Sequence, residues 1–147
     1  MRSVRVERTI EAPIERVFDL LSDHAGYHRF RGITGSAVVR EGEPPPNGLG
    51  ALRRIDVGML HFEEEITAFE PPARMDYLIV KVNLPFEHEG GSIRLEQTTE
   101  GTHVVWTSSF WITVPVLGGL AAAVFAMRLS SGFNRVLEDV DRMLTER

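Results

Sequence analysis

An arginine and a glutamate on neighbouring predicted strands, Arg53 and Glu64, are the residue pair in this chain best suited to acid–base chemistry. If both point into one apolar cavity, Arg53 polarises a carbonyl or binds a carboxylate, and Glu64 acts as acid or base. A carboxylate buried there needs a positive partner to keep its charge. Two other interpretations stay open. The two residues form a purely structural ion pair, or both side chains face solvent because the inward and outward sides of these strands are assigned wrongly.

The alternation of side chains along a strand decides which residues face the same cavity. Ile55 points inward as an apolar residue, and Arg53, two positions away, therefore points inward too. Tyr77 either donates a hydrogen bond to a ligand oxygen or packs as a plain aromatic residue, and Trp106 either stacks on a planar ligand or fills the core. A one-residue bulge would reverse any of these directions. The residues that alternation turns inward on the other strands are Phe62, Glu64, Tyr77, Glu89, Trp106, Ser108 and Phe110.

Histidines offer a second kind of chemistry, but their spacing argues against a metal site. His24 and His28 lie four residues apart in a predicted short helix, a spacing that can hold a metal, yet no third ligand is evident near them. We interpret them as a surface pair beside the cavity mouth. His88, between Glu87 and Glu89, is interpreted as a solvated strand end. We therefore predict no metal and no other cofactor.

Composition excludes several classes of protein. The 147 residues contain no cysteine, which excludes disulfides, thiolate zinc sites and cysteine nucleophiles. The net charge is −5 and the basic residues are scattered, which argues against a nucleic-acid partner. No serine lies in a nucleophile elbow, and Gly90-Gly91 lacks the context of a phosphate loop. Without the apolar run of a signal peptide, we expect one cytoplasmic domain over residues 1–147.

The last thirty residues predict one long helix, from about Gly118 to Thr145. Charged residues occupy one face: Arg128, Arg135, Glu138, Asp139, Arg142 and Glu146. Apolar residues recur at helical spacing on the other: Leu129, Phe133, Val136, Leu137, Val140 and Leu144. A helix of that length needs cover along its whole apolar face, and one curved antiparallel sheet can supply it. A sheet wrapped around a helix tends to leave a cavity between the two.

Strand patterns dominate the chain before that helix. Two short helices, 14–21 and 24–30, follow the first strand, and the predicted strands are 3–11, 36–40, 49–58, 60–69, 74–83, 87–98 and 102–113. The uncharged segment from Thr107 to Met127 is interrupted by Pro115 and a glycine pair, so we interpret it as strand, turn and helix start rather than a membrane span. The predicted fold class is α+β, with a seven-stranded curved antiparallel sheet wrapped around the C-terminal helix.

Four short motifs occur in a fixed order along nearly the whole chain. They are Ile10-Glu11-Ala12-Pro13-Ile14-Glu15-Arg16-Val17-Phe18, Gly48-Leu49-Gly50, Ile66-Thr67-Ala68-Phe69-Glu70-Pro71-Pro72-Ala73-Arg74-Met75, and Gly101-Thr102-His103-Val104-Val105-Trp106. In this order the chain resembles the START-like (SRPBCC) superfamily of helix-grip proteins, most closely its polyketide cyclase/dehydrase branch. The resemblance implies a deep pocket between sheet and C-terminal helix. It does not determine an activity, because one fold serves many functions.

Three functions are compatible with this resemblance. The leading one is binding of a hydrophobic, aromatic or polyketide-like small molecule. The first alternative is a cyclase or dehydratase whose catalytic candidates are Arg53, Glu64 and Tyr77, and the second is a protein-interaction module of the co-chaperone or ribosome-associated type. The residues predicted to contact the ligand are Arg53, Phe62, Glu64, Tyr77, Trp106, Ser108, Phe110 and Phe125.

The start of the long helix is apolar all round, from Val116 to Met127. Its small residues leave room for a cavity beneath Phe125. Leu120, Val124 and Met127 would be exposed on a monomer, as a pocket mouth, a dimer surface or a membrane-touching edge. Besides the small molecule, the partner that this surface predicts is a second copy of the chain.

Overall fold

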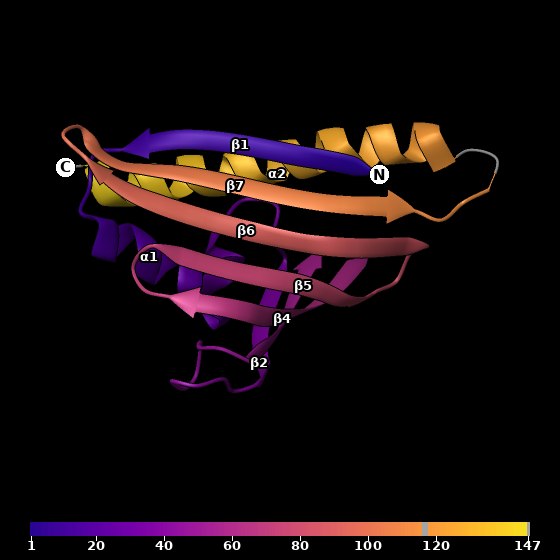
Figure 1. Cartoon of the computed structure of the whole chain (residues 1–147), viewed down its shortest axis with the longest axis horizontal. Helices are drawn as coiled ribbons and strands as arrows, with labels where there is room; N and C mark the ends of the chain where they lie inside the picture. The colour runs from indigo at the N-terminus through magenta and orange to yellow at the C-terminus, as the bar shows by residue number, and fades with distance from the viewer. Residues whose placement is uncertain (116–117, 147) are drawn as a thin grey trace.

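The computed structural model describes residues 1–115 and 118–146, in which one curved antiparallel sheet wraps a long helix (Figure 1). The sheet has the order β1-β7-β6-β5-β4-β3-β2. Its strands are β1 (Arg2–Ile10), β2 (Gly35–Arg40), β3 (Leu52–Val57), β4 (Leu60–Glu70), β5 (Arg74–Val82), β6 (Phe86–Thr98) and β7 (Gly101–Ile112). Helix α1 (Ile14–Ser22) and the 3-10 helix η1 (His24–Arg29) follow β1, and α2 (Gly118–Thr145) ends the chain. The predicted fold class is confirmed.

The local sequence explains the short elements. Pro13 immediately precedes α1, a place where a missing N–H costs nothing, and the helix buries Val17, Phe18 and Leu21 on one face. Strand β3 begins later than predicted, at Leu52. Gly50 has a φ of +84°, which bends the chain just before the strand and leaves residue 49 in an isolated bridge instead of the ladder.

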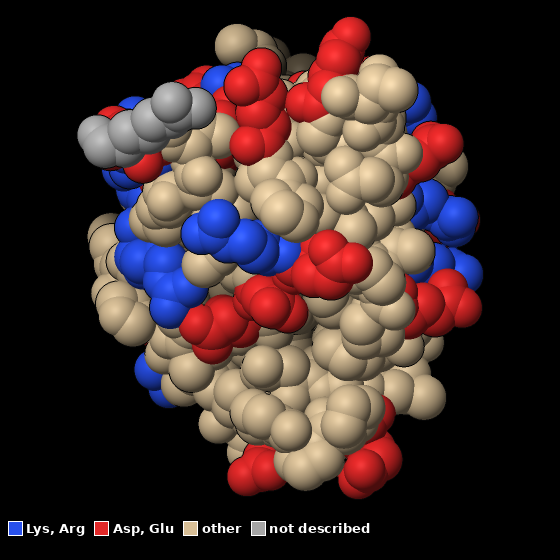
Figure 2. Space-filling view, turned by 90° about the vertical axis from the view of Figure 1, so that its left-hand side faces the viewer, with Lys and Arg blue, Asp and Glu red and all other residues tan. Residues whose placement is uncertain are grey.

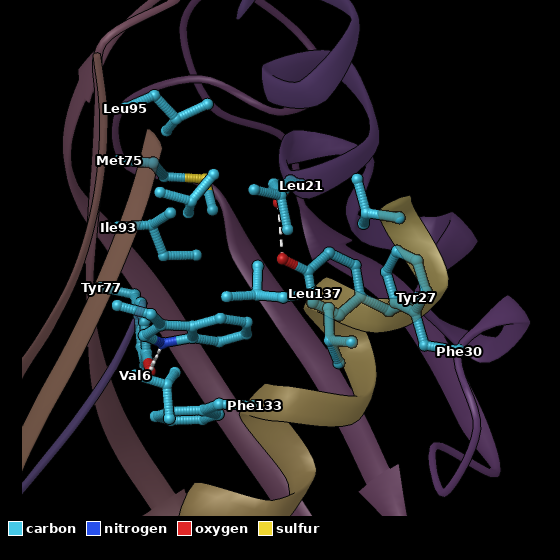
Figure 3. Packing of buried hydrophobic residues seen from close by; sticks show 14 of the residues in the cluster. Val6, Leu21, Tyr27, Phe30, Met75, Tyr77, Ile93, Leu95, Phe133 and Leu137 are labelled. Atoms are coloured by element: carbon cyan, nitrogen blue, oxygen red, sulfur yellow. Dashed lines mark hydrogen bonds between the residues drawn. The ribbon is translucent and has the colours of Figure 1, made fainter. Parts of the chain in front are cut away.

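The C-terminal half of α2 forms the core with the sheet. Its apolar stripe is buried as predicted, and the ring of Phe133 stacks on that of Trp106 with centroids 4.0 Å apart. Figure 3 shows Phe133 and Leu137 projecting from α2 toward Tyr77 and Ile93 on the strands opposite. This end of the helix is therefore solidly packed.

One residue of the predicted charged face is buried instead. Asp139 is fully buried, and its carboxylate accepts hydrogen bonds from the main-chain N–H and the Nε–H of Arg31, both at 2.8 Å. Arg142 approaches the same carboxylate to 3.1 Å. The prediction placed Asp139 in solvent because helical spacing says nothing about the loop after η1, which supplies Arg31.

The N-terminal half of α2 is less covered. Leu120 and Met127 are 67% and 73% exposed, and Val124 is exposed as well. Val116 and Leu117, which begin the apolar segment in the sequence, lie outside the described residues. None of the described helices is long and apolar enough to cross a membrane. At the opposite end, where α1 and the C-terminus lie, Figure 2 shows acidic and basic side chains interspersed above a largely uncharged area.

Candidate functional site

A cavity of about 460 Å³ lies between the inner face of the sheet and α2. Its volume is in the range of small-molecule sites, which confirms the predicted cavity. Apolar and aromatic side chains form most of its wall: Tyr27, Ile55, Leu60, Phe62, Ile79, Trp106, Phe125, Leu129, Phe133 and Val136. We call its solvent-exposed rim the mouth, made of Arg31, Gly32, Val57, Gly58, Arg128 and Arg135.

The predicted pair of Arg53 and Glu64 lies inside this cavity. The two residues are direct cross-strand partners of β3 and β4, so their side chains share one face of the sheet. Glu64 Oε1 accepts hydrogen bonds from Arg53 Nε at 2.9 Å and from Nη2 at 2.8 Å. Arg53 is 1% exposed and Glu64 7%. No partner for Glu64 Oε2 occurs among the described residues, so this oxygen is available to a ligand.

Arg53 is held between two tyrosine rings. Its Cζ lies 4.7 Å from the ring centroid of Tyr27 and 5.2 Å from that of Tyr77, within the range of cation–π attraction. Burial opposes the charge of Arg53, but the adjacent Glu64 carboxylate, together with Tyr27 and Tyr77, outweighs this effect and raises the pKa of the guanidinium. The pair therefore remains an ion pair inside the cavity.

His24 completes the support of Arg53, which corrects its prediction as a surface residue. The ring is fully buried, and Arg53 Nη1–H donates to His24 Nδ1 at 3.2 Å. His24 Nε2–H donates in turn to the main-chain oxygen of Asn47 at 2.9 Å. Burial, with the charge of Arg53, lowers the pKa of His24 to about 3, so the ring is neutral and positions the arginine. His28 is exposed and does not join it.

Tyr77 presents its hydroxyl at the cavity wall. The hydroxyl oxygen accepts the indole N–H of Trp106 at 2.9 Å, a bond drawn in Figure 3. Within the described part of the chain its own hydrogen has no acceptor, which leaves it for a ligand. Gly91 lies opposite on β6, and any Cβ there would collide with the tyrosine ring, so this glycine is what lets the ring lie flat. Burial raises the pKa of Tyr77, which makes it a hydrogen-bond donor.

A bulge in β6 places His88 inward and Glu89 in solvent, the reverse of the prediction for both residues. His88 Nδ1 accepts the main-chain N–H of Ile79 at 2.9 Å, and its Nε2–H donates to Ser108 Oγ at 2.8 Å. Burial lowers the pKa of His88 to about 4, so it is neutral. Because Ser108 accepts this bond, its own hydroxyl hydrogen can point to the cavity.

Seven of the eight predicted ligand-contact residues line the cavity. The exception is Phe110, which is buried behind it, where its ring stacks on that of Phe86 and meets that of Phe125 edge-on, with centroids 5.4 Å and 5.1 Å away. We call the polar members of the lining Arg53, Glu64, Tyr77 and Ser108 the polar floor. It combines an ion pair, a free carboxylate oxygen and two hydroxyl donors on one apolar cavity.

Sequence reasoning missed the two histidines behind the polar floor and the arginines of the mouth. For His88 a signal existed: paired glycines within a strand mark a bulge, and the bulge between His88 and Gly90 reverses the facing of the residues before it. For His24 none did, because its contact with Arg53 joins residues distant in the chain. No group of three or more acidic or histidine side chains able to hold a metal occurs in residues 1–115 and 118–146.

Comparison with known proteins agrees with this architecture. The sequence model of a family described as polyketide cyclase / dehydrase and lipid transport matches residues 1–144. The chain belongs to this family. A search of curated proteins finds no match.

Solved structures share the fold of this family member. The protein TTHA0849 of Thermus thermophilus is similar with a TM-score of 0.80 and 24% identity, covering 97% of each chain. A START superfamily protein of Mycobacterium smegmatis has a TM-score of 0.79 at 15% identity, covering 97% of this chain and 99% of its own. The Aha1 dimer of Colwellia psychrerythraea has a TM-score of 0.70 at 16% identity, covering 99% and 98%. At these identities the similarity shows the fold alone.

Proposed function

We propose that the protein binds a small molecule with an apolar body, whose polar end meets the polar floor. The single observation that carries this proposal is the cavity of about 460 Å³, which has a mostly apolar wall and a few convergent polar groups. The lipid-transport part of the family's description and the START superfamily relative of Mycobacterium smegmatis are consistent with it. A filled space between sheet and helix would instead have supported the protein-interaction module.

The polar floor restricts the ligand's polar end. The hydroxyls of Tyr77 and Ser108 donate, so they suit a carbonyl, ether or phenol oxygen. Glu64 Oε2 accepts, so it suits a hydroxyl or amine hydrogen. The charge of Arg53 is already compensated by Glu64, and a second buried charge would lack a partner there. A neutral oxygen-bearing group is therefore the best match at the inner end.

Binding of the neutral fluorescent dye N-phenylnaphthylamine tests the proposal. We expect the dye to brighten on the wild-type protein, and the Leu129→Trp variant to bind at least about tenfold more weakly because the larger side chain fills the cavity. Leu120→Trp is the matched control, since it makes the same change on the same helix at an exposed position. Equal dye affinity in the two variants, or no binding to the wild type, would contradict the proposal.

The polar floor can be tested separately with naphthol, a phenolic probe. In Arg53→Leu we expect weaker binding of naphthol, because Glu64 loses the cation that holds its Oε1. The double variant Arg53→Leu/Glu64→Leu should recover thermal stability relative to the single one, since removing both charges leaves no unpaired buried ion. If both variants bind naphthol and melt like the wild type across about pH 5–8, the ion pair has no role in binding or stability.

A second candidate function, an acid–base enzyme, is favoured by the burial of Arg53, Glu64 and Tyr77 together. Glu64 Oε2 would take a proton from the carbon next to a carbonyl, while the Tyr77 hydroxyl donates a hydrogen bond to the carbonyl oxygen. The products are an enolate and a neutral carboxylic acid, the first step of an aldol-type cyclisation.

Hydrogen–deuterium exchange at carbon tests this enzymatic alternative directly. β-Tetralone in deuterium oxide should exchange its α-hydrogens faster with the wild-type protein than in buffer, and Glu64→Gln should abolish the acceleration. N-Phenylnaphthylamine binding by Glu64→Gln serves as the control for an intact cavity. If the wild type exchanges no faster than Glu64→Gln, the protein acts by binding alone.

A further inference from the structure

Two arginines of α2 stand at the cavity mouth without an acidic partner. Arg128 and Arg135 are exposed, line the cavity and lie seven residues apart, so they project from the same side of the helix two turns apart. Among the residues that the structure describes, neither has a carboxylate oxygen within 4.0 Å. In a chain with a net charge of −5, this pair is a local excess of positive charge.

The acidic residues nearby are already bound to other arginines. Arg31, the third cation of the mouth, contacts Glu138 at 3.1 Å and Asp139 at 2.8 Å. Arg142 forms a second ion pair with Asp139, in which its Nη1 lies 3.1 Å from Oδ1. The charges of Arg128 and Arg135 therefore have no counterpart in this part of the protein, although both residues border an apolar cavity.

Space between the two arginines is left open by glycine. Gly132 lies between them on the same helix face and lines the cavity, and a Cβ at this position would meet no atom within 4 Å. Across the opening, a Cβ on Gly32 would lie 3.2 Å from Arg135 Nη1, so this guanidinium reaches over the mouth to the loop after η1.

We propose that Arg128 and Arg135 bind the anionic group of a monomeric amphiphile, a carboxylate or sulfonate, whose apolar body occupies the cavity. This inference rests on the proposed binding function and adds the charge and orientation of the ligand. A guanidinium binds such oxygens by paired, charge-assisted hydrogen bonds. The anion stays hydrated at the mouth while the apolar body loses its contact with water, so no charge has to be buried.

Two dyes that differ by one sulfonate make the test. Anilinonaphthalenesulfonate is N-phenylnaphthylamine with an added sulfonate, so any difference between them reports on the anion. In Arg128→Gln/Arg135→Gln we expect the sulfonate dye to bind at least about tenfold more weakly and the neutral dye to be unchanged. Arg16→Gln/Arg94→Gln, which removes two exposed arginines outside the cavity lining, is the control and should bind both dyes like wild type.

The outcomes separate this inference from the proposed function. If the neutral dye binds and the sulfonate dye is unaffected by Arg128→Gln/Arg135→Gln, the arginine site is wrong and the binding function stands. If neither dye binds the wild type, both proposals fail. Dodecanoate below its micelle concentration should displace the sulfonate dye from the wild type. Failure to displace it, together with arginine-dependent sedimentation on phosphatidylglycerol vesicles, would overturn the monomeric ligand in favour of a membrane surface.

Discussion

The two halves of α2 carry similar apolar residues but meet different surroundings. We call the half from Phe133 to Thr145 the tight half and the half from Gly118 to Gly132 the loose half. The C-terminal half packs between the sheet, α1 and the loop after η1, and it buries Phe133, Leu137 and Val140 together with the charged Asp139. The N-terminal half has the sheet and the cavity on one side and solvent on the other. Figure 1 shows α1 on the side of the C-terminal end of the helix. One helix thus acts as core toward its C-terminus, is exposed on its outer face toward its N-terminus, and borders the cavity along its middle, from Phe125 to Val136.

The difference teaches that apolar content by itself does not identify core. Leu120 and Met127 are as apolar as Leu137, yet they are mostly exposed, because none of the described elements packs over them. Phe125 is intermediate: it touches Phe86 and Phe110 on one side and the cavity on the other. The residues of the loosely packed half are therefore free to serve a ligand or a partner at little cost to stability.

The largest expected effect is at Phe133 in the tight half. Phe133→Ala should lower the free energy of unfolding by about 3–5 kcal/mol, because it removes a buried ring stacked on Trp106 and leaves a void beside it. Denaturant unfolding followed by far-ultraviolet circular dichroism measures this. A loss below about 1 kcal/mol would mean that the tight half is not part of the core.

Acid should lower the free energy of unfolding through His88, whose ring stacks on that of Phe86. The folded pKa is lowered to about 4 from an ordinary 6.5, so the unfolded chain takes up the proton first as the pH falls. The contribution of neutral His88 to the free energy of unfolding is therefore fully present above about pH 6.5. It falls as the pH drops toward 4, and the loss is about 2–3 kcal/mol at pH 4.5.

Comparison of His88→Gln with the wild type isolates this contribution from that of His24. The amide of glutamine can accept from Ile79 and donate to Ser108 without titrating. The variant should therefore lose less unfolding free energy than the wild type between about pH 7 and pH 4.5. Parallel pH profiles for the two proteins would show that His88 is not the neutral, buried group described.

The buried carboxylate of the tight half should give a slightly smaller effect. Burial alone would raise the pKa of Asp139, but hydrogen bonds from Arg31 lower it below its ordinary value, so the group is charged at neutral pH. Asp139→Asn should cost about 2 kcal/mol, the scale of hydrogen bonds to a charged group. Thermal melting at neutral pH measures it, with exposed Glu138→Gln as control. Equal melting of both variants would argue against a buried ion.

Phe125→Ala should cost less than Phe133→Ala, about 1–2 kcal/mol, because its ring is only half-buried, whereas the ring of Phe133 is buried and stacked on Trp106. Its effect should appear in ligand affinity instead. Unfolding free energies and N-phenylnaphthylamine affinities measured side by side for both variants test this. Equal stability losses would erase the distinction between core and cavity wall.

The smallest effect is expected on the outer face of the loose half. Leu120→Ser should change the unfolding free energy of the monomer by less than about 0.5 kcal/mol, as exposed positions usually do. Light scattering on the same samples tests the predicted homodimer: a dimer that dissociates in Leu120→Ser supports it, and a monomeric wild type contradicts it.

Periodicity accounts for most of what the sequence predicted correctly. Alternation in β3 and β4 placed Arg53 and Glu64 on one face, and they are direct cross-strand partners. Helical spacing placed Phe133 and Leu137 in the core. Both patterns succeed because regular elements repeat their side-chain directions at a fixed interval, which the chain itself encodes.

The failures lie where regularity ends. A bulge reversed His88 and Glu89, and Phe110 was displaced from the cavity by the ring of Phe125, which α2 brings over it. Asp139 became buried because a distant loop delivers Arg31 to it. Each error concerns an irregular backbone position or a contact between separate elements, neither of which has a local period to reveal it.

By itself the sequence determined the α+β class, the order of the elements and the side chains that face the sheet's concave side, because these follow from local repeats of apolar residues. Only the tertiary structure decided that His24 supports Arg53, that Tyr77 lies flat over Gly91, and that Arg128 and Arg135 frame an open mouth. Those arrangements depend on how the curved sheet and the helices pack together. This packing brings together residues that lie far apart in the sequence, so no sequence spacing predicts their contacts.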